Sequence, residues 1–182
     1  MKSPAAGCRG FTLIEVLIAL AVLALLAGVA VPAWSGASAA AHAGAAQSSL
    51  LGSLTRAIGH AAIAGSEVVL CPGDAGGCRD SYDWSGGWVA FADPDGDGVR
   101  DPGEPVLQTQ PALAAGIHLR STRGRRRLVF QPNGGNAGSN VTFTLCDGRG
   151  AGRAQALVLA NDGRLHASPA KPAAAAACMQ GL

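Results

Sequence analysis

The sequence Arg9-Gly10-Phe11-Thr12-Leu13-Ile14-Glu15 runs directly into the apolar segment Val16–Val31, and this junction sets how the fold begins. A segment of this length and composition is typical of a membrane-spanning helix. Glu15 places a carboxylate inside it, and because an ionisable side chain in hydrocarbon is costly, we interpret Glu15 as a functional residue. A secretory signal peptide is cut after its apolar region, whereas the candidate site here, Gly10, precedes it, so we expect the apolar segment to be retained. The alternative is an ordinary signal anchor with a chance glutamate.

Beyond Trp34 the pattern changes to that of an amphipathic helix. Apolar residues recur there at steps of three and four, namely Leu50, Leu51, Leu54, Ile58 and Ala62. Gly65 and Ser66 end the pattern. We expect this second helical part to pack its leucine stripe on a globular domain.

The rest of the chain predicts a β-rich domain. With 26 glycines and only 4% aromatic residues, the composition favours short strands and many turns. Eight short runs have β-type patterns: Glu67–Cys71, Gly87–Ala92, Pro105–Gln110, Ile117–Ser121, Arg127–Gln131, Val141–Cys146, Ala156–Ala160 and Arg164–Ala167. They follow one another too closely for crossover helices, so we expect antiparallel sheets. We interpret Pro169–Ala177 as a low-complexity tail.

The hexapeptide G-F-T-L-I-E at Gly10–Glu15, followed by an apolar helix, resembles the class III signal of type IV pilins and of the pseudopilins of type II secretion. This resemblance implies cleavage after Gly10 by a prepilin peptidase and N-methylation of Phe11. It also implies an assembly role for Glu15. Inside a helical bundle, the Glu15 carboxylate of one subunit and the free α-amine at Phe11 of another can neutralise each other, which removes an otherwise costly charge.

A second block, W-S-G-G-W-V-A-F-A-D at Trp84–Asp93, extends the resemblance over nearly the whole chain. Together with Cys71–Cys78, Phe143–Cys146 and Asn161–Arg164, it resembles the GspH/FimT group of minor pseudopilins and minor pilins. That group implies an α+β, pilin-like fold, in which a long N-terminal helix with an apolar transmembrane first half packs on antiparallel β-sheets. The expected parts are a cleaved leader at 1–10, a transmembrane and assembly helix at 11–32, an amphipathic helix at 33–65 and a β-rich soluble domain at 66–182.

The cysteines predict an oxidised, exported domain. Cys8 lies in the leader and would be lost on cleavage. The remaining Cys71, Cys78, Cys146 and Cys178 allow three pairings as two disulfides. We favour Cys71–Cys78, which closes a glycine-rich loop, and Cys146–Cys178, which ties down the alanine-rich tail. A zinc site is the alternative, but the sequence contains no C-x-x-C pair and no histidine at ligand spacing.

An acidic loop matches the calcium-binding pattern D-x-D-x-D-G-x5-E. Its candidate ligands are Asp93, Asp95, Asp97, the Val99 carbonyl, Asp101 and Glu104. The flanking runs predict strands, where an EF-hand has helices, and two prolines constrain the loop. Weak calcium binding and an ordinary acidic hairpin loop therefore both remain open.

Basic residues concentrate in the second half of the soluble part, although the net charge is only +2. From His118 to Lys171 there are nine Lys and Arg residues against two acidic ones. The candidate DNA-binding residues are Arg120, Arg123, Arg125, Arg126, Arg127, Arg149, Arg153, Arg164 and His166. Arginines in a turn can follow a phosphate backbone. FimT-like members bind DNA through a C-terminal G-R-x-R element, which reads G-R-L-H here, with His166 in place of the second arginine. The alternative is a solvated basic face or a contact with acidic neighbours in the pilus.

Nothing in the sequence supports catalysis, and we name no catalytic residue. The four histidines are scattered, no serine lies in a G-x-S-x-G elbow, and no P-loop is present. We expect a minor pilin or pseudopilin in the bacterial inner membrane, with a periplasmic domain, assembled with other subunits near the tip of a type IV pilus or a type II secretion pseudopilus. It would bind double-stranded DNA for natural transformation, or else serve as a purely structural tip pseudopilin.

Overall fold

The computed structural model describes residues 10–138 and 140–180 of the chain. The chain divides into two compact units, Met1–Ala37 and Ser38–Leu182, and helix α1 (Leu13–Ala64) contributes to both. We describe each unit by itself.

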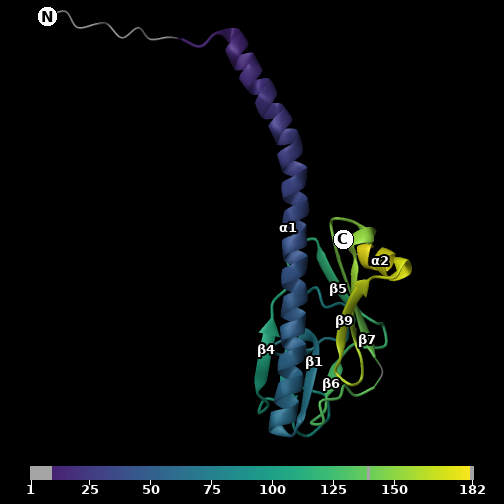
Figure 1. The fold of residues 1–182 in the computed structure, drawn as a ribbon. Helices are drawn as coiled ribbons and strands as arrows, with labels where there is room; N and C mark the ends of the chain where they lie inside the picture. Colours follow the sequence, from purple (N-terminus) through teal and green to yellow (C-terminus); the bar gives the residue numbers. More distant parts are fainter. Residues whose placement is uncertain (1–9, 139, 181–182) are drawn as a thin grey trace, which may run out of the picture. The chain divides into compact units, whose positions relative to one another are not determined.

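In the first unit, α1 runs without interruption through Pro32 (Figure 1). The helix begins where the Thr12 hydroxyl oxygen accepts a hydrogen bond from the Glu15 backbone N–H at 3.3 Å. The large apolar side chains from Phe11 to Trp34 are all exposed. By length and composition, α1 can cross a membrane.

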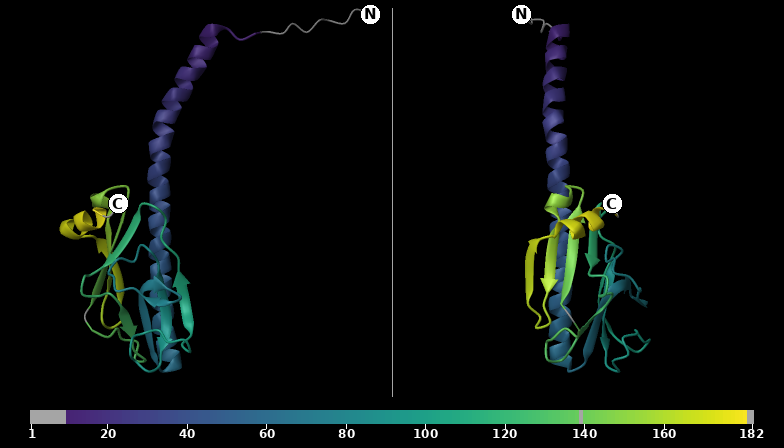
Figure 2. Two further views of the ribbon diagram at one scale, coloured as in Figure 1. Left: turned by 180° about the vertical axis from the view of Figure 1, so that it is seen from behind. Right: turned by 90° about the vertical axis from the view of Figure 1, so that its right-hand side faces the viewer.

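In the second unit, nine strands form two antiparallel sheets (Figures 1 and 2). The first sheet contains β1 (Glu67–Asp74), β2 (Gly77–Cys78), β3 (Trp88–Asp93), β4 (Val106–Gln110) and β6 (Leu128–Phe130). The second has the order β5-β7-β8-β9 and contains β5 (Ile117–Ser121), β7 (Val141–Asp147), β8 (Gln155–Leu159) and β9 (Leu165–Pro169). In the first sheet, β1 lies between β3 on one side and β2 and β6 on the other.

The second half of α1 and one face of each sheet share the main core. From α1, the leucines Leu50 and Leu54 are fully buried. They join side chains such as Leu70 of the first sheet and Phe143 of the second in one apolar cluster. Every buried side chain in the described part of the chain lies between Ala43 and Cys178. The folded domain therefore begins within α1, well before residue 66, and a fragment of residues 38–182 contains its whole core.

Two tryptophans anchor this core. Trp84 and Trp88 are fully buried, as expected for core anchors, and Trp84 meets Phe143 edge-on at 5.0 Å. The Trp88 indole N–H donates to the buried Ser53 hydroxyl at 2.9 Å, and that hydroxyl in turn donates to the Ser49 carbonyl. The Trp84 indole N–H has no hydrogen-bond partner among the described residues.

All eight predicted strands are present, most within one residue of the expected ends, and the sheets are antiparallel as expected. The two-residue strand β2 and the short 3-10 helix η1 (Ala151–Arg153) were not predicted. The interpretation of Pro169–Ala177 as a low-complexity tail is wrong. The end of β9 and helix α2 (Pro172–Met179) occupy that segment. Alanine has the highest helix propensity, and Pro172 occupies the first turn, where proline is tolerated.

Candidate functional site

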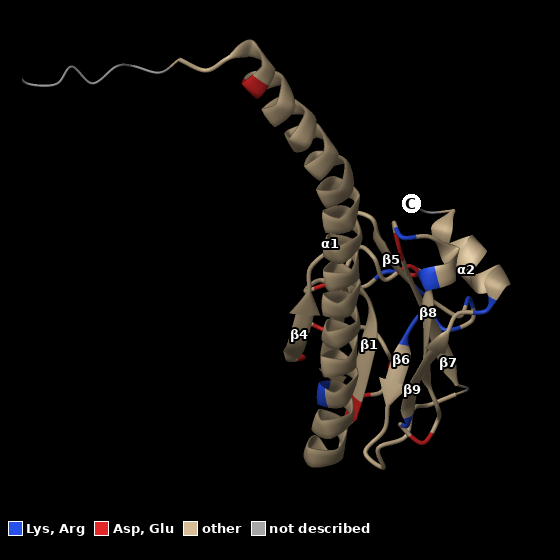
Figure 3. Ribbon diagram, turned by 45° about the horizontal axis from the view of Figure 1, so that its top comes forward, with Lys and Arg blue, Asp and Glu red and all other residues tan. Residues whose placement is uncertain are grey.

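The cleavage junction lies at the exposed start of α1. Gly10, Phe11 and Glu15 are all exposed. Glu15 is the only ionisable residue between Phe11 and Ala41, and Figure 3 shows a single acidic turn near the start of an otherwise uncharged stretch. Within the described residues of the single chain, no cation pairs with Glu15.

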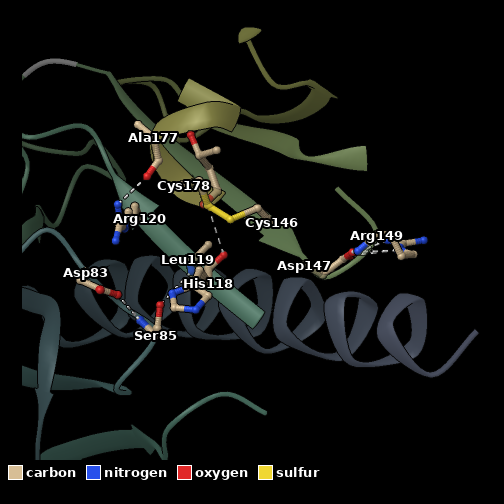
Figure 4. The surroundings of a disulfide bond; sticks show 11 residues. Asp83, Ser85, His118, Leu119, Arg120, Cys146, Asp147, Arg149, Ala177 and Cys178 are labelled. Atoms are coloured by element: carbon tan, nitrogen blue, oxygen red, sulfur yellow. Dashed lines mark hydrogen bonds and ion pairs between the residues drawn. A yellow bond between two sulfur atoms is a disulfide. The ribbon is translucent and has the colours of Figure 1, made fainter. Parts of the chain in front are cut away.

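Both favoured disulfides are present. Cys71–Cys78 links β1 to β2 and closes the short hairpin between them. Cys146–Cys178 links β7 to α2, and these two cysteines form a small buried cluster with Ala154 and Ala175 (Figure 4). The Arg120 Nη1 donates to the Ala177 carbonyl at 2.8 Å, which gives α2 a second attachment.

The acidic loop joins β3 to β4 and is organised by its own carboxylates. Asp93 is buried, and its two oxygens accept hydrogen bonds from the backbone N–H groups of Gly96 and Gly98, both at 3.0 Å. Gly98 has φ of 73°, which suits glycine at the sharp turn. Burial raises the pKa of Asp93, partly offset by these backbone hydrogen bonds.

Three of the six candidate calcium ligands come together. Asp93, Asp95 and Asp97 each offer an oxygen atom, and these atoms lie within 4.8 Å of one another. Asp101 and Glu104 do not belong to this group. The Glu104 carboxylate accepts a hydrogen bond from the Asp101 backbone N–H at 2.9 Å, so it closes the end of its own loop.

The basic turn after β5 contributes to a groove of about 660 Å³, which we call the arginine groove. Its guanidinium groups belong to Arg79, Arg100, Arg125, Arg126 and Arg127. Asp80 is the only acidic side chain among the described residues that line it, and it pairs with Arg126. The groove therefore carries a strong excess of positive charge.

Two of these arginines also hold loops in place. Arg125 donates to the Asn136 side-chain oxygen and to the Ala137 carbonyl, both at 2.9 Å, and burial lowers its pKa. Arg127 donates to the Gly98 carbonyl at 2.9 Å and so ties the basic turn to the acidic loop. Arg126 is exposed, and among the described residues it pairs with the exposed Asp80.

A second groove, of about 630 Å³, lies on the face of the second sheet that points away from α1. We call it the sheet groove, and it is lined in part by Arg120, Arg123, Thr144, Val158, His166 and Lys171. Three of the nine candidate DNA-binding residues thus lie here, apart from Arg125–Arg127. The two grooves meet along the turn between β5 and β6, whose residues line one or the other.

The other three candidates lie elsewhere. Arg149 forms a side-chain pair with the buried Asp147 at 2.7 Å, and the hydrogen bonds from Arg149 lower the Asp147 pKa (Figure 4). Arg149 and Arg153 line a smaller groove beside α1. Arg164 pairs with Asp162 at 2.7 Å, and both are exposed. The structure therefore distributes the nine residues over several sites.

Sequence reasoning missed four residues of the two large grooves: Arg79, Arg100, Tyr82 and Lys171. Arg79 and Arg100 lie in the first half of the soluble part, where acidic residues outnumber basic ones, so a count of charges along the sequence does not single them out. Lys171 lies within the segment that was interpreted as a low-complexity tail. No local pattern connects these positions to the basic turn.

A mostly apolar first half of α1 with one carboxylate, followed by a disulfide-bonded domain that packs on its second half, defines a membrane-anchored, pilin-like subunit. The family described as "Type II transport protein GspH" matches residues 46–163, and the prokaryotic N-terminal methylation motif matches residues 6–31. The first match covers more than half of the chain, so this protein belongs to the GspH family. No curated protein matches the chain.

Among solved structures, the chain is similar to the type IV minor pilin FimU of Pseudomonas aeruginosa in two crystal forms. One form is 17% identical, with 74% of this chain and 91% of that chain covered and a TM-score of 0.55. The other form is 18% identical; the match covers 64% of this chain and 84% of that chain, with a TM-score of 0.48. The first likeness confirms the pilin-like fold. The family consists of structural pilin and pseudopilin subunits, so this chain assembles with other such subunits.

Proposed function

We propose that this protein is a minor subunit near the tip of a type IV pilus or a type II secretion pseudopilus. The main support for this proposal is Glu15, which is the only ionisable residue in the apolar first half of α1. The second half of this helix belongs to a GspH-family domain. A prepilin peptidase removes residues 1–10, Phe11 is methylated, and the subunit waits in the bacterial inner membrane with its domain in the periplasm. The role is assembly and recognition at the tip, without catalysis.

Mass spectrometry of the chain recovered from membranes tests this maturation. The wild-type chain should start at Phe11 and carry one added methyl group. Gly10→Val should remain at full length, because the bulkier side chain does not fit a tight cleavage site. Ala5→Val, in the leader but away from the junction, is the matched control and should be processed normally. An unprocessed wild-type chain in assembled filaments would contradict the proposal.

Duplex DNA is the second candidate partner, favoured by the five guanidinium groups of the arginine groove. Arginine contacts to phosphates give sequence-independent affinity that falls with salt. The alternative within the same family is a purely structural tip pseudopilin of type II secretion without nucleic-acid binding.

Binding of a mixed-sequence duplex to residues 38–182 at several salt concentrations separates these functions. We expect micromolar or weaker affinity, with a log–log salt slope of roughly −0.9 for each phosphate neutralised. Arg126→Ala should reduce the slope by about one such contact without releasing a loop. Arg56→Ala, which removes an exposed arginine of α1 that lines neither large groove, is the control. Absence of any complex at low salt and tens of micromolar protein would leave only the structural role.

We also propose weak calcium binding by the acidic loop, favoured by the convergence of Asp93, Asp95 and Asp97. Because the folded-state pKa of Asp93 is raised, ionising this carboxyl costs stability as the pH rises through that pKa, and a bound cation would offset the cost. Outside an EF-hand, a dissociation constant on the order of 10⁻⁴–10⁻³ M is expected.

Thermal unfolding of residues 38–182 tests the calcium proposal. Several millimolar calcium should raise the melting temperature, and Asp95→Asn with Asp97→Asn should abolish the rise. These two carboxylates are exposed, whereas Asp93 holds the loop backbone and is left intact. Asp74→Asn, in the β1–β2 hairpin, is the control. An unchanged melting temperature would make the loop an ordinary acidic turn.

A further inference from the structure

The floor of the sheet groove consists of two cross-strand rows of side chains. The strand register aligns Arg120, Thr144, Ala156 and Ser168 in one row. The second row contains Thr142, Val158 and His166. The residues that alternate with these in the strands, such as Leu119 and Phe143, point into the main core. The floor therefore combines threonine and serine hydroxyl groups with the apolar atoms of Ala156 and Val158, and Arg120 and His166 add basic groups to it.

The walls of the groove come from two other elements. Lys171 and Ala177 belong to the segment that contains α2, whereas Tyr82 lies in the loop before β3 and Arg123 in the turn after β5. The Arg123 guanidinium lies over the Tyr82 ring, 5.7 Å from its centroid, which orders this charge beside the groove.

Every ionisable side chain on the described lining, apart from the Tyr82 phenol and the disulfide-bonded Cys178, is basic. These are Arg120, Arg123, His166 and Lys171, and no carboxylate lines the groove. The Arg120 Nε is buried without a hydrogen-bond partner in the described part of the chain, although its Nη1 holds α2. A groove lined by one sign of charge attracts ligands of the opposite sign.

The volume of about 630 Å³ is within the range of sites that hold a small ligand or a short peptide. Threonine and serine hydroxyls on the floor can bond peptide groups, and Val158 and Ala156 offer apolar contact. We propose that the sheet groove binds an extended, carboxylate-bearing peptide segment of a neighbouring protein. This site is separate from the arginine groove, and the proposal does not depend on DNA binding.

Fluorescence anisotropy tests the proposal with residues 38–182 and a labelled octapeptide of alternating aspartate and threonine. We expect saturable binding, and at least tenfold weaker binding of the matched asparagine–threonine peptide. Arg123→Glu with Lys171→Glu should weaken binding by more than tenfold. Ser168→Trp, which fills the groove without changing its charge, should also weaken it. Arg79→Glu with Arg126→Glu alters the arginine groove by the same charge and should change the affinity less than twofold.

Several results would overturn the proposal. They are equal binding of the two peptides, no binding of either, or loss of binding only in the arginine-groove variant. Binding that survives Ser168→Trp would reduce the effect to non-specific charge attraction. Displacement of the peptide by duplex DNA that depends on Arg123 and Lys171 would make the groove a nucleic-acid site. Melting curves verify that each variant is folded.

Discussion

Replacing Glu15 by valine should leave a processed, folded subunit that no longer enters the filament. The apolar half of α1 remains intact and Gly10 is still available to the peptidase, so membrane insertion and cleavage should continue. What is lost is the carboxylate that neutralises a Phe11 α-amine in the assembled bundle. A charge without a partner in hydrocarbon costs several kcal/mol. We therefore expect at least a tenfold loss of the subunit from the assembled fraction, a loss that immunoblotting of sheared filaments or of cross-linked pseudopili can measure.

Two further variants separate charge from shape. Glu15→Gln retains the size of the side chain and should fail like Glu15→Val. Glu15→Asp retains the charge and should assemble at least partly. The control is Leu17→Val, a change between uncharged apolar residues in the same helix, which should assemble normally. Normal assembly of Glu15→Val would show that the neutralisation argument is wrong.

Of the two disulfides, Cys146–Cys178 should be the one whose removal destabilises the domain more. This bridge closes a sequence separation of 32 residues, whereas Cys71–Cys78 closes only 7. In the chain-entropy model, these loops correspond to about 4 and about 2 kcal/mol of stability. Cys146→Ser with Cys178→Ser should lower the melting temperature of residues 38–182 by on the order of 10 °C. The double variant that removes the other disulfide, Cys71→Ser with Cys78→Ser, should lower the melting temperature by about half as much.

Hydrogen exchange adds a local measurement to the same experiment. Without the bridge, α2 keeps the Arg120 hydrogen bond and the packing of Ala175 and Met179 but loses its covalent link, so its amides should exchange much faster while those of β3 change little. In the wild type, peptide mapping should find Cys146 linked to Cys178 and no free thiol in the exported domain. Unchanged protection of α2 in the double variant would contradict a clamping role for the disulfide.

The sequence predicts the architecture well where hydrophobic periodicity is strong. Ile117–Ser121 alternates buried and half-buried residues and matches β5 at both ends. The antiparallel arrangement follows from strand spacing alone. By contrast, β2 has only two residues and therefore no periodicity, and it lies in the short hairpin that the Cys71–Cys78 disulfide closes. Helix α2 was missed because a run of alanines has helix propensity but no amphipathic pattern.

The candidate sites are harder to predict, because they depend on contacts between distant segments. Arg123 and Arg126 are three residues apart in sequence, yet they line different grooves on the two sides of one turn. Arg79 and Arg100 reach the arginine groove from other loops, and only the tertiary fold brings them there. The pairing of Arg149 with Asp147 and of Arg164 with Asp162 is local, but counting charges over a long segment obscures it.

The hydrogen bond between Ser53 and Trp88 has a consequence for how α1 can tolerate insertions. If α1 slid by one turn in one direction, Ala57 would replace Ser53 opposite the indole and leave its N–H unpaired, at a cost of about 1–3 kcal/mol. If it slid in the other direction, Ser49 would restore the hydroxyl, but Ala46 would replace Leu50 and open a cavity. Both shifts are thus disfavoured, by different forces. The register of α1 against the core is therefore fixed. A residue inserted between Phe11 and Ala43 would lengthen the part of the helix that precedes the core, and the packing of the domain would stay the same.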